Sequence, residues 1–247
     1  MGDNYFIFNG VSSLDMGLVV KKVPGRRIPR KDLETYRVPG RSEPLHVWKQ
    51  SWEPYPVRYE CWFLGDPPEK AIHAIAEWLH GAPVKSRLED SYDTTVYRWA
   101  TYEGGADVDM LMRTAGKFTV EFTVGAQGYL KSYETAIAFT QSGGFLNNPS
   151  PSATRPLIRA VTDGIRVGGT INIGTSALTI LFPGGGKYEI WIDCEEDEAW
   201  TVVDGVETSV NLWIDGADFI EMQPGRNDVS FTNSFESVTV WTRAYTL

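Results

Sequence analysis

The chain has 247 residues, a formal net charge of −9 and a sequence pI near 4.9. This length allows two domains that each bury a core of their own. The 24 glycines, 14 prolines and 13% aromatic residues favour a β-rich fold with many turns over a helical bundle. No apolar run approaches the roughly 20 residues of a membrane-spanning helix, and no secretion signal is visible. We therefore expect no membrane insertion.

The first strong local signal is a hairpin. Residues 5–8 form an apolar run, and Asn9-Gly10 follows at once. Because both residues accept a positive φ, this dipeptide favours a tight β-turn. A strand at 18–20 continues the pairing.

A basic segment comes next. It holds eight Lys or Arg against two acidic residues, although the whole chain is acidic; the cations are Lys21, Lys22, Arg26, Arg27, Arg30, Lys31, Arg37 and Arg41. Pro39-Gly40 lies near its end and matches a type II turn, in which Gly supplies the positive φ. We expect a projecting arm over about 24–45. Its candidate subunit-interface residues are Arg37, Val38, Pro39, Gly40, Arg41 and Leu45.

One segment, 66–81, is convincingly helical. Asp66 can cap it, Pro67 suits the first helical position and Glu69 completes a capping box. Apolar residues recur on one face at Ile72, Ile75, Ala76 and Leu79. A strand over 118–124 alternates apolar and polar residues, so residues 1–140 are predicted to form an α+β domain.

The rest of the chain is predicted to be all strand. Residues 141–152 are rich in Gly, Ser, Asn and Pro, which is typical of a linker. Short strands with Gly-rich turns then follow through 153–247, a pattern typical of a β-sandwich. The fold class is thus mainly β, an α+β domain followed by a sandwich.

The strand patterns of the second domain place three tryptophans away from its aliphatic core. Trp191, Trp213 and Trp241 each alternate with apolar neighbours in runs 188–194, 210–214 and 238–242. They are candidates for a partner surface, which would contact a neighbouring subunit or a sugar ring. The alternative is that loops or the first domain cover them.

Few residues in the chain suggest catalysis. The three histidines are dispersed, and no zinc, nucleophile-elbow or phosphate-loop motif occurs. The acidic run Glu195–Glu198 is typical of a solvated turn rather than of a calcium loop or a glycosidase pair. Cys61 and Cys194 are expected to be buried free thiols, with one long-range disulfide as the alternative. The sequence predicts no enzyme, no metal site and no cofactor.

A set of short motifs in order along the chain resembles the distal tail protein family of long-tailed (siphovirus-type) bacteriophages and prophages. The motifs are Phe8-Asn9-Gly10-Val11-Ser12-Ser13, Asp15, Gly17-Leu18, Val38-Pro39-Gly40-Arg41, Glu77-Trp78-Leu79, Phe118-Thr119-Val120-Glu121-Phe122, Ile192-Asp193-Cys194 and Gln223-Pro224-Gly225-Arg226-Asn227. After Phe122 the chain departs from the family's pattern, since Thr123-Val124 stands where members often carry Cys and Pro.

The resemblance implies a structural virion protein at the tail tip, made in the cytoplasm of the bacterial host. It implies a hexameric ring built by the first domains, with a galectin-like sandwich as the second. Such a ring joins the tail tube protein to the tail-tip hub protein or baseplate and docks receptor-binding proteins, while DNA only passes through its channel. The alternative function is a carbohydrate-binding sandwich that attaches to host-surface glycan.

Overall fold

The computed structural model describes residues 4–22, 24–25, 28–64, 68–111, 114–203, 205–216 and 218–247. The chain divides into two compact units, residues 1–128 with residue 247, and residues 129–246. This division precedes the expected linker 141–152. Within that segment Phe145–Asn148 form strand β13, whose Leu146 is buried in the second core, so the segment is part of the second unit.

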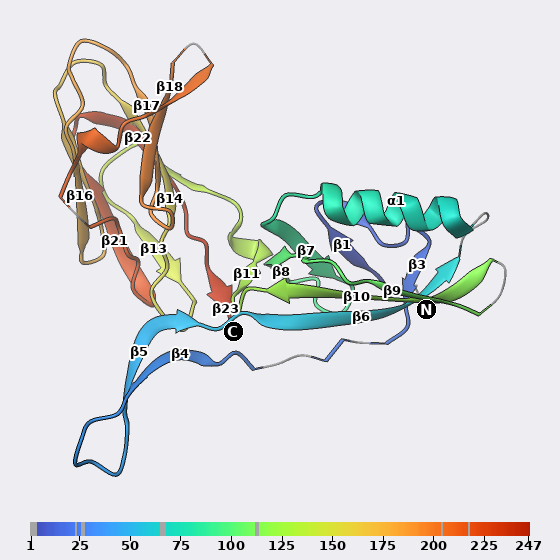
Figure 1. The fold of residues 1–247 in the computed structure, drawn as a ribbon. Coiled ribbons are helices and arrows are strands. Elements are labelled where there is room, and N and C mark those ends of the chain that lie inside the picture. Colours follow the sequence, from blue (N-terminus) through green and yellow to red (C-terminus); the bar gives the residue numbers. More distant parts are fainter. Residues whose placement is uncertain are drawn as a thin grey trace. The chain divides into compact units, whose positions relative to one another are not determined.

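The first unit is built on an antiparallel sheet (Figure 1). Its strands in spatial order are β2 (Val11–Ser12), β1 (Phe6–Phe8), β7 (Ser86–Asp90), β8 (Val96–Thr101), β10 (Ala115–Val124), β6 (Tyr55–Leu64) and β3 (Leu18–Val20), and β9 (Asp107–Met110) also pairs with β10. The β6 and β10 strands are paired along their whole length, from Ala115 opposite Leu64 to Val124 opposite Tyr55.

The predicted hairpin at Asn9-Gly10 is present. Asn9 has φ 50° and Gly10 has φ 79°, and Phe8 lies opposite Val11. A two-residue turn with both φ angles positive matches the twist of the flanking strands. The local dipeptide therefore sets the register of β1, whose Phe6 and Phe8 side chains are fully buried.

Alternation along the two long strands produces the core of the first unit. Tyr59 and Phe63 of β6 are buried on the same face as Phe118 and Phe122 of β10. Helix α1 (Pro68–Gly81) lies along the sheet (Figure 1) and adds Ile75 and Leu79 to this core. The predicted helix is thus confirmed, while its expected cap, Asp66-Pro67, lies outside the described residues. Within the described ranges, no helix has the length and apolarity needed to cross a membrane.

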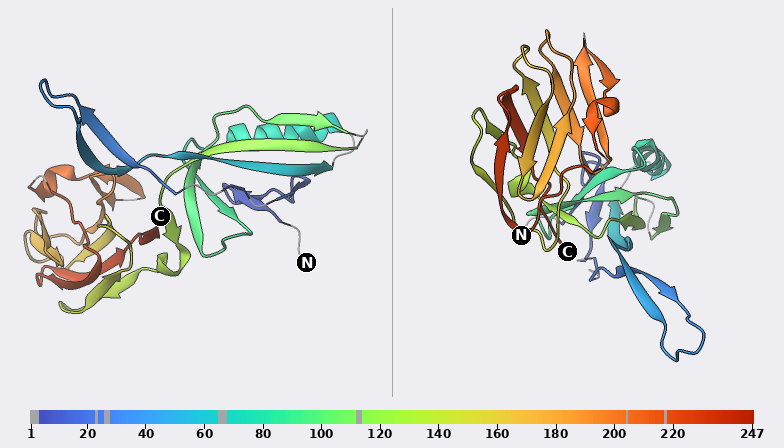
Figure 2. Two further views of the ribbon diagram at one scale, coloured as in Figure 1. Left: turned by 90° about the horizontal axis from the view of Figure 1, so that it is seen from below. Right: turned by 90° about the vertical axis from the view of Figure 1, so that its left-hand side faces the viewer.

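Two further strands of the first unit pair only with each other among the described residues. They are β4 (Lys31–Tyr36) and β5 (Leu45–Trp52), an antiparallel hairpin drawn in blue in Figures 1 and 2. We call residues 31–52 the arm hairpin.

The second unit is a β-sandwich, as predicted. One sheet has the order β12 (Ile137–Phe139), β22 (Phe235–Trp241), β14 (Leu157–Thr162), β17 (Glu189–Asp193), β18 (Glu198–Val203) and β19 (Val206–Ser209). The other has the order β13, β21 (Gly225–Phe231), β15 (Gly169–Ile173), β16 (Ser176–Ile180) and β20 (Ile214–Asp215). The short strands β11 (Gly128–Leu130) and β23 (Tyr245–Thr246) pair with each other, and β11 also pairs with β8, so they belong to neither sandwich sheet. A 3₁₀ turn, η1 (Lys131–Tyr133), follows β11.

The expected strand over 210–214 is wrong. Asn211–Trp213 form a 3₁₀ turn, η2, and only Ile214–Asp215 continue as β20. Because a 3₁₀ turn places every third residue on one side, strict alternation fails here. Leu212, expected in the core, is 98% exposed, whereas Val210 is buried.

Candidate assembly surfaces

The tip of the arm hairpin has the turn that its sequence predicts. The Arg41 N–H donates to the Val38 carbonyl at 3.1 Å, which closes a four-residue turn. Gly40 has φ 81°, a value that a residue with a Cβ adopts only with strain. Pro39 and Gly40 therefore place the flanking side chains of Arg37 and Arg41 at this end of the hairpin.

Both faces of the arm hairpin carry large apolar side chains. On one face Leu33 lies opposite Trp48, and the Trp48 ring packs edge-on against Trp52 with centroids 5.9 Å apart. The Lys31 ammonium lies 4.6 Å from the Trp48 ring centroid on that face. On the other face Tyr36 lies opposite Leu45.

These side chains are not covered within the described chain. Six apolar residues of the hairpin and its tip are between 37% and 47% exposed: Leu33, Tyr36, Val38, Leu45, Val47 and Trp48. A lone two-stranded hairpin is at best marginally stable in water, and an apolar surface of this kind marks an interaction site. The hairpin therefore has the properties of a segment that is completed by a partner.

All six interface candidates lie at or beside the tip, and all are exposed. Among the described residues neither Arg37 nor Arg41 forms an ion pair. Arg26 and Arg27 of the basic segment lie outside the described residues. Sequence reasoning missed Leu33 and Trp48, although the alternating run from Leu45 to Trp52 was a readable strand signal.

The partner-surface candidates in the sandwich are only partly brought together. Trp191 and Trp241 are half-buried on the outer face of their sheet, with ring centroids 5.5 Å apart. Trp200 was not among the candidates from the sequence. It lies opposite Trp191 on β18, and its ring stacks nearly parallel to the Trp191 ring, with centroids 6.2 Å apart. Trp213 does not join them. It packs edge-on against Tyr188 next to the core, because η2 turns it away from the outer face.

Polar groups hold this tryptophan cluster in place. Arg159 pairs with Glu189, and the Arg159 guanidinium lies 5.7 Å from the Trp191 ring centroid. The Trp191 indole N–H donates to Glu189 at 3.0 Å. Hydrogen bonding from Arg159 is the main cause that lowers the pKa of Glu189. Since Trp191 has Trp200, Trp241 and Arg159 around its ring, little of that ring is open to stack on a sugar.

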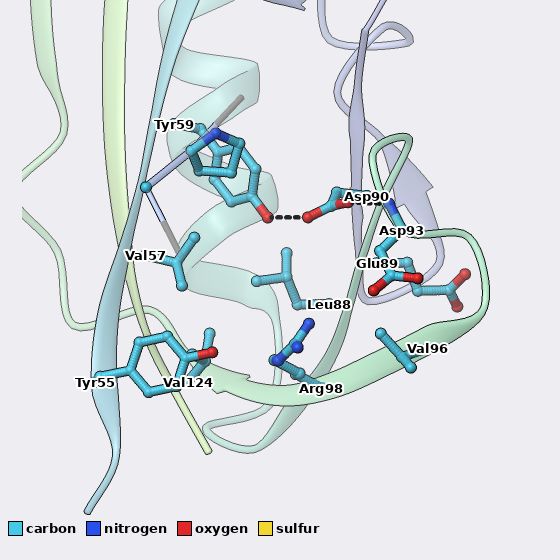
Figure 3. A pocket seen from close by; sticks show the side chains of 12 residues that line it. Tyr55, Val57, Tyr59, Leu88, Glu89, Asp90, Asp93, Val96, Arg98 and Val124 are labelled. Atoms are coloured by element: carbon cyan, nitrogen blue, oxygen red, sulfur yellow. Dashed lines mark hydrogen bonds between the residues drawn. The ribbon is translucent and has the colours of Figure 1, made fainter. Parts of the chain in front are cut away.

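The first unit contains a small cavity between β6, β7 and β8 (Figure 3). It measures about 20 Å³, room for about one water molecule, and is too small for a substrate. Asp90 and Arg98 line it, and the Tyr59 hydroxyl donates to the Asp90 carboxylate at 3.2 Å (Figure 3). This hydrogen bond joins β6 to β7 of the sheet.

The two cysteines are free and buried. Burial raises the pKa of both the Cys61 and Cys194 thiols to about 12, so neither forms a nucleophilic thiolate near neutral pH. Within the described residues no group of three or more potential ligands could hold a metal ion. The exposed apolar side chains of the arm hairpin are therefore the feature on which we base the proposal below.

Solved structures of phage proteins have a fold similar to that of this chain. The Dit protein of phage SPP1, described as a paradigm of the hub adsorption apparatus in phages that infect Gram-positive bacteria, matches 97% of this chain and 98% of its own, with a TM-score of 0.72 at 14% identity. The chain has the fold of a phage distal tail protein.

Two further matches are structures of the phage P2 baseplate in its activated conformation, with calcium and with strontium. They cover 97% of this chain and 97% and 98% of theirs, with TM-scores of 0.59 and 0.57 at 8% and 7% identity. No protein-family model and no curated protein sequence matches the chain. The distal tail protein fold includes both units, so the predicted mainly-β fold class is confirmed.

Proposed function

We propose that this chain is a structural component of a phage tail tip or baseplate and that it acts by assembling into a ring, with six copies as the expected number. The observation that carries the proposal is the arm hairpin, whose two faces both expose large apolar side chains. The full-length fold match to a phage Dit protein supports the same role.

The arm hairpin suits contact between neighbouring copies. A ring needs one surface of each copy to contact a different surface of the next, since such heterologous contacts close by rotation. The hairpin supplies a projecting surface, with Val38 and Leu45 as apolar anchors. Arg37 and Arg41 are exposed there and form no ion pair with any residue that the structure describes. An acidic receiving surface on the next copy would complement those charges.

In this role the ring joins the tail tube protein to the tail-tip hub protein and offers its outside to receptor-binding proteins. DNA passes through the channel without being bound. The net charge of −9 supports this, because acidic walls repel nucleic acid. The proposed location is the virion tail tip, after synthesis in the cytoplasm of the bacterial host, and the proposed role involves no catalysis.

The test is the oligomeric state of the purified chain, measured by size-exclusion chromatography with light scattering and by negative-stain imaging. The wild-type chain should form a closed ring at micromolar or higher concentration. Arg37→Glu with Arg41→Glu should give folded monomers, because both charges at the tip are reversed.

Lys70→Glu with Arg226→Glu is the matched control. Both side chains are exposed and lie outside the hairpin, and the two substitutions change the net charge by the same amount as those at the tip. The control should still form rings. A wild-type chain that stays monomeric at high concentration, alone and with its tail partners, would refute the proposal.

A further inference from the structure

The sandwich exposes a second apolar surface, distinct from the tryptophan cluster. It consists of Ile165, Val167, Leu181 and Leu212, which are between 54% and 98% exposed. We call these four residues the loop patch. They belong to three segments: the β14–β15 loop, the residue after β16, and η2.

Backbone contacts bring the three segments together. The Leu181 N–H donates to the Trp213 carbonyl, directly after Leu212, at 2.6 Å. The Gly168 N–H, directly after Val167, donates to the Phe182 carbonyl at 3.1 Å. The three segments that carry the four exposed apolar residues are therefore adjacent in the structure.

The β14–β15 loop is held rigidly by its polar residues. The Asp163 carboxylate accepts from the backbone N–H groups of Ile165 and Arg166 at 2.8 and 3.0 Å. The Arg166 guanidinium donates both to Asp163 at 2.6 Å and to the Asn233 carbonyl at 2.7 Å. The loop thus presents Ile165 to solvent from a fixed backbone, which lowers the entropy cost of binding a partner there.

Exposed acidic residues precede and follow η2 along the chain, and one of them, Asp215, lies on β20 opposite Thr179 of β16. Glu207, Asp215 and Asp218 are exposed in the segments that flank η2, and within the described ranges none of them forms an ion pair. The nearby cations Arg166 and Lys187 are each paired, with Asp163 and Glu236. A partner that fits this surface carries aliphatic side chains together with unpaired Lys or Arg.

The tip of the arm hairpin has that chemistry. Val38 and Leu45 are exposed aliphatic residues. Arg37 and Arg41 lie beside them and have no ion-pair partner within the described ranges. We propose that the arm hairpin tip of one copy docks on the loop patch of a second copy. This inference rests on the proposed ring and specifies which surface receives the arm.

Disulfide trapping between two variants, each with one introduced cysteine, tests the contact. Arg41→Cys is mixed with tagged Leu212→Cys under mild oxidation, and disulfide-linked pairs that contain both chains are counted by mass spectrometry. Only contacts between copies can give such pairs. The native Cys61 and Cys194 are at most 1% exposed and do not compete. The control mixture combines Arg41→Cys with Val84→Cys, because Val84 is 78% exposed but lies outside the loop patch. The Arg41→Cys and Leu212→Cys mixture should yield at least ten times more mixed pairs than this control.

The outcomes separate this inference from the proposed function. Rings in light scattering with no excess of Arg41–Leu212 pairs would overturn the docking site and leave the ring intact. Preferential pairing of Leu212→Cys with itself would indicate contact between two sandwiches and would also overturn it. If no oligomer forms, both proposals fail.

A second variant tests the proposed docking site without an introduced cysteine. Leu212→Ser with Ile165→Ser removes two exposed side chains, so the core is untouched and the chain should fold as the wild type does. The concentration at which half of the rings dissociate should rise at least tenfold, while Val84→Ser should leave it unchanged. An equal concentration for all three chains would contradict the docking site.

Discussion

The ion pair of Asp193 and Arg243 illustrates how single residues stabilise the sandwich. Two Arg243 nitrogens each donate to one Asp193 oxygen at 2.6 Å, and these side chains are only 14% and 23% exposed. Asp193 also accepts from the backbone N–H groups of Glu195 and Glu196. It therefore connects the turn after β17 to the segment before β23.

The pKa of Asp193 follows from these contacts. Burial raises it, but the hydrogen bonds and charge of Arg243, with the two backbone N–H groups, outweigh burial and hold it below the usual value. A lowered folded pKa means that this stabilisation is present above the unfolded pKa of about 3.9 and is lost as the pH falls through the folded pKa.

Asp193→Asn should destabilise the second unit by about 2–3 kcal/mol at pH 7. Arg243, which is largely buried, then keeps its longer ion pair with Glu195 at 3.3 Å but faces a neutral side chain in place of Asp193. Hydrogen exchange resolved by peptide measures this, with the first unit as internal reference. The difference from wild type should shrink as the pH falls below the unfolded pKa of about 3.9, and it should vanish once the pH has passed through the lower folded pKa, at which Asp193 of the wild type loses its charge. Asp228→Asn is the control, since its pair with Arg226 is exposed and should contribute less than about 1 kcal/mol. Equal losses in both variants would contradict this account.

At the scale of elements, the arm hairpin differs from every long strand pair around it. The β6 and β10 strands bury one whole face, whereas β4 and β5 bury neither. A pair of hydrogen-bonded strands that buries little apolar surface opens readily, because burial then offsets little of the conformational entropy that the chain loses on folding. The hairpin should therefore be the least protected sheet in an isolated copy.

Hydrogen exchange at two protein concentrations checks this. In the monomer, amides of residues 31–52 should exchange within seconds, and in the ring they should slow by at least tenfold, because a partner then covers the hairpin. Amides of β10 should exchange equally slowly in both states. Protection of the hairpin that does not depend on assembly would show that it is stable on its own.

At the scale of the molecule, the described core residues form two clusters, one within each unit. The core of the second unit includes Ile158, Ile190 and Val240 from one sheet and Ile171 and Ile180 from the other. A domain with a complete core can fold alone. We therefore expect the division at Gly128–Tyr129 to separate two folding units.

Residues 129–247 expressed alone should accordingly fold and unfold in one cooperative thermal transition, followed by circular dichroism. A shorter piece, 153–247, lacks β12 and the buried Leu146 of β13. It should be markedly less stable, because an edge of each sheet is removed. If the longer piece melts without cooperativity, the two units are not independent.

The sequence alone determined the features that depend on neighbouring residues. Asn9-Gly10 and Pro39-Gly40 specify their turns through local φ preferences, and the alternation over 118–124 specifies a strand with one buried face. These signals act within a few residues, so they are readable without knowing the rest of the fold.

Only the tertiary structure decided which surfaces are covered. Leu212 has the pattern of a core residue but is exposed, and Trp200 rather than Trp213 joins the outer tryptophans. The predicted linker contains a strand because β21, some 80 residues later, supplies its hydrogen-bond partners. Burial is a property of segments far apart in sequence that meet in space, and local patterns do not contain that information.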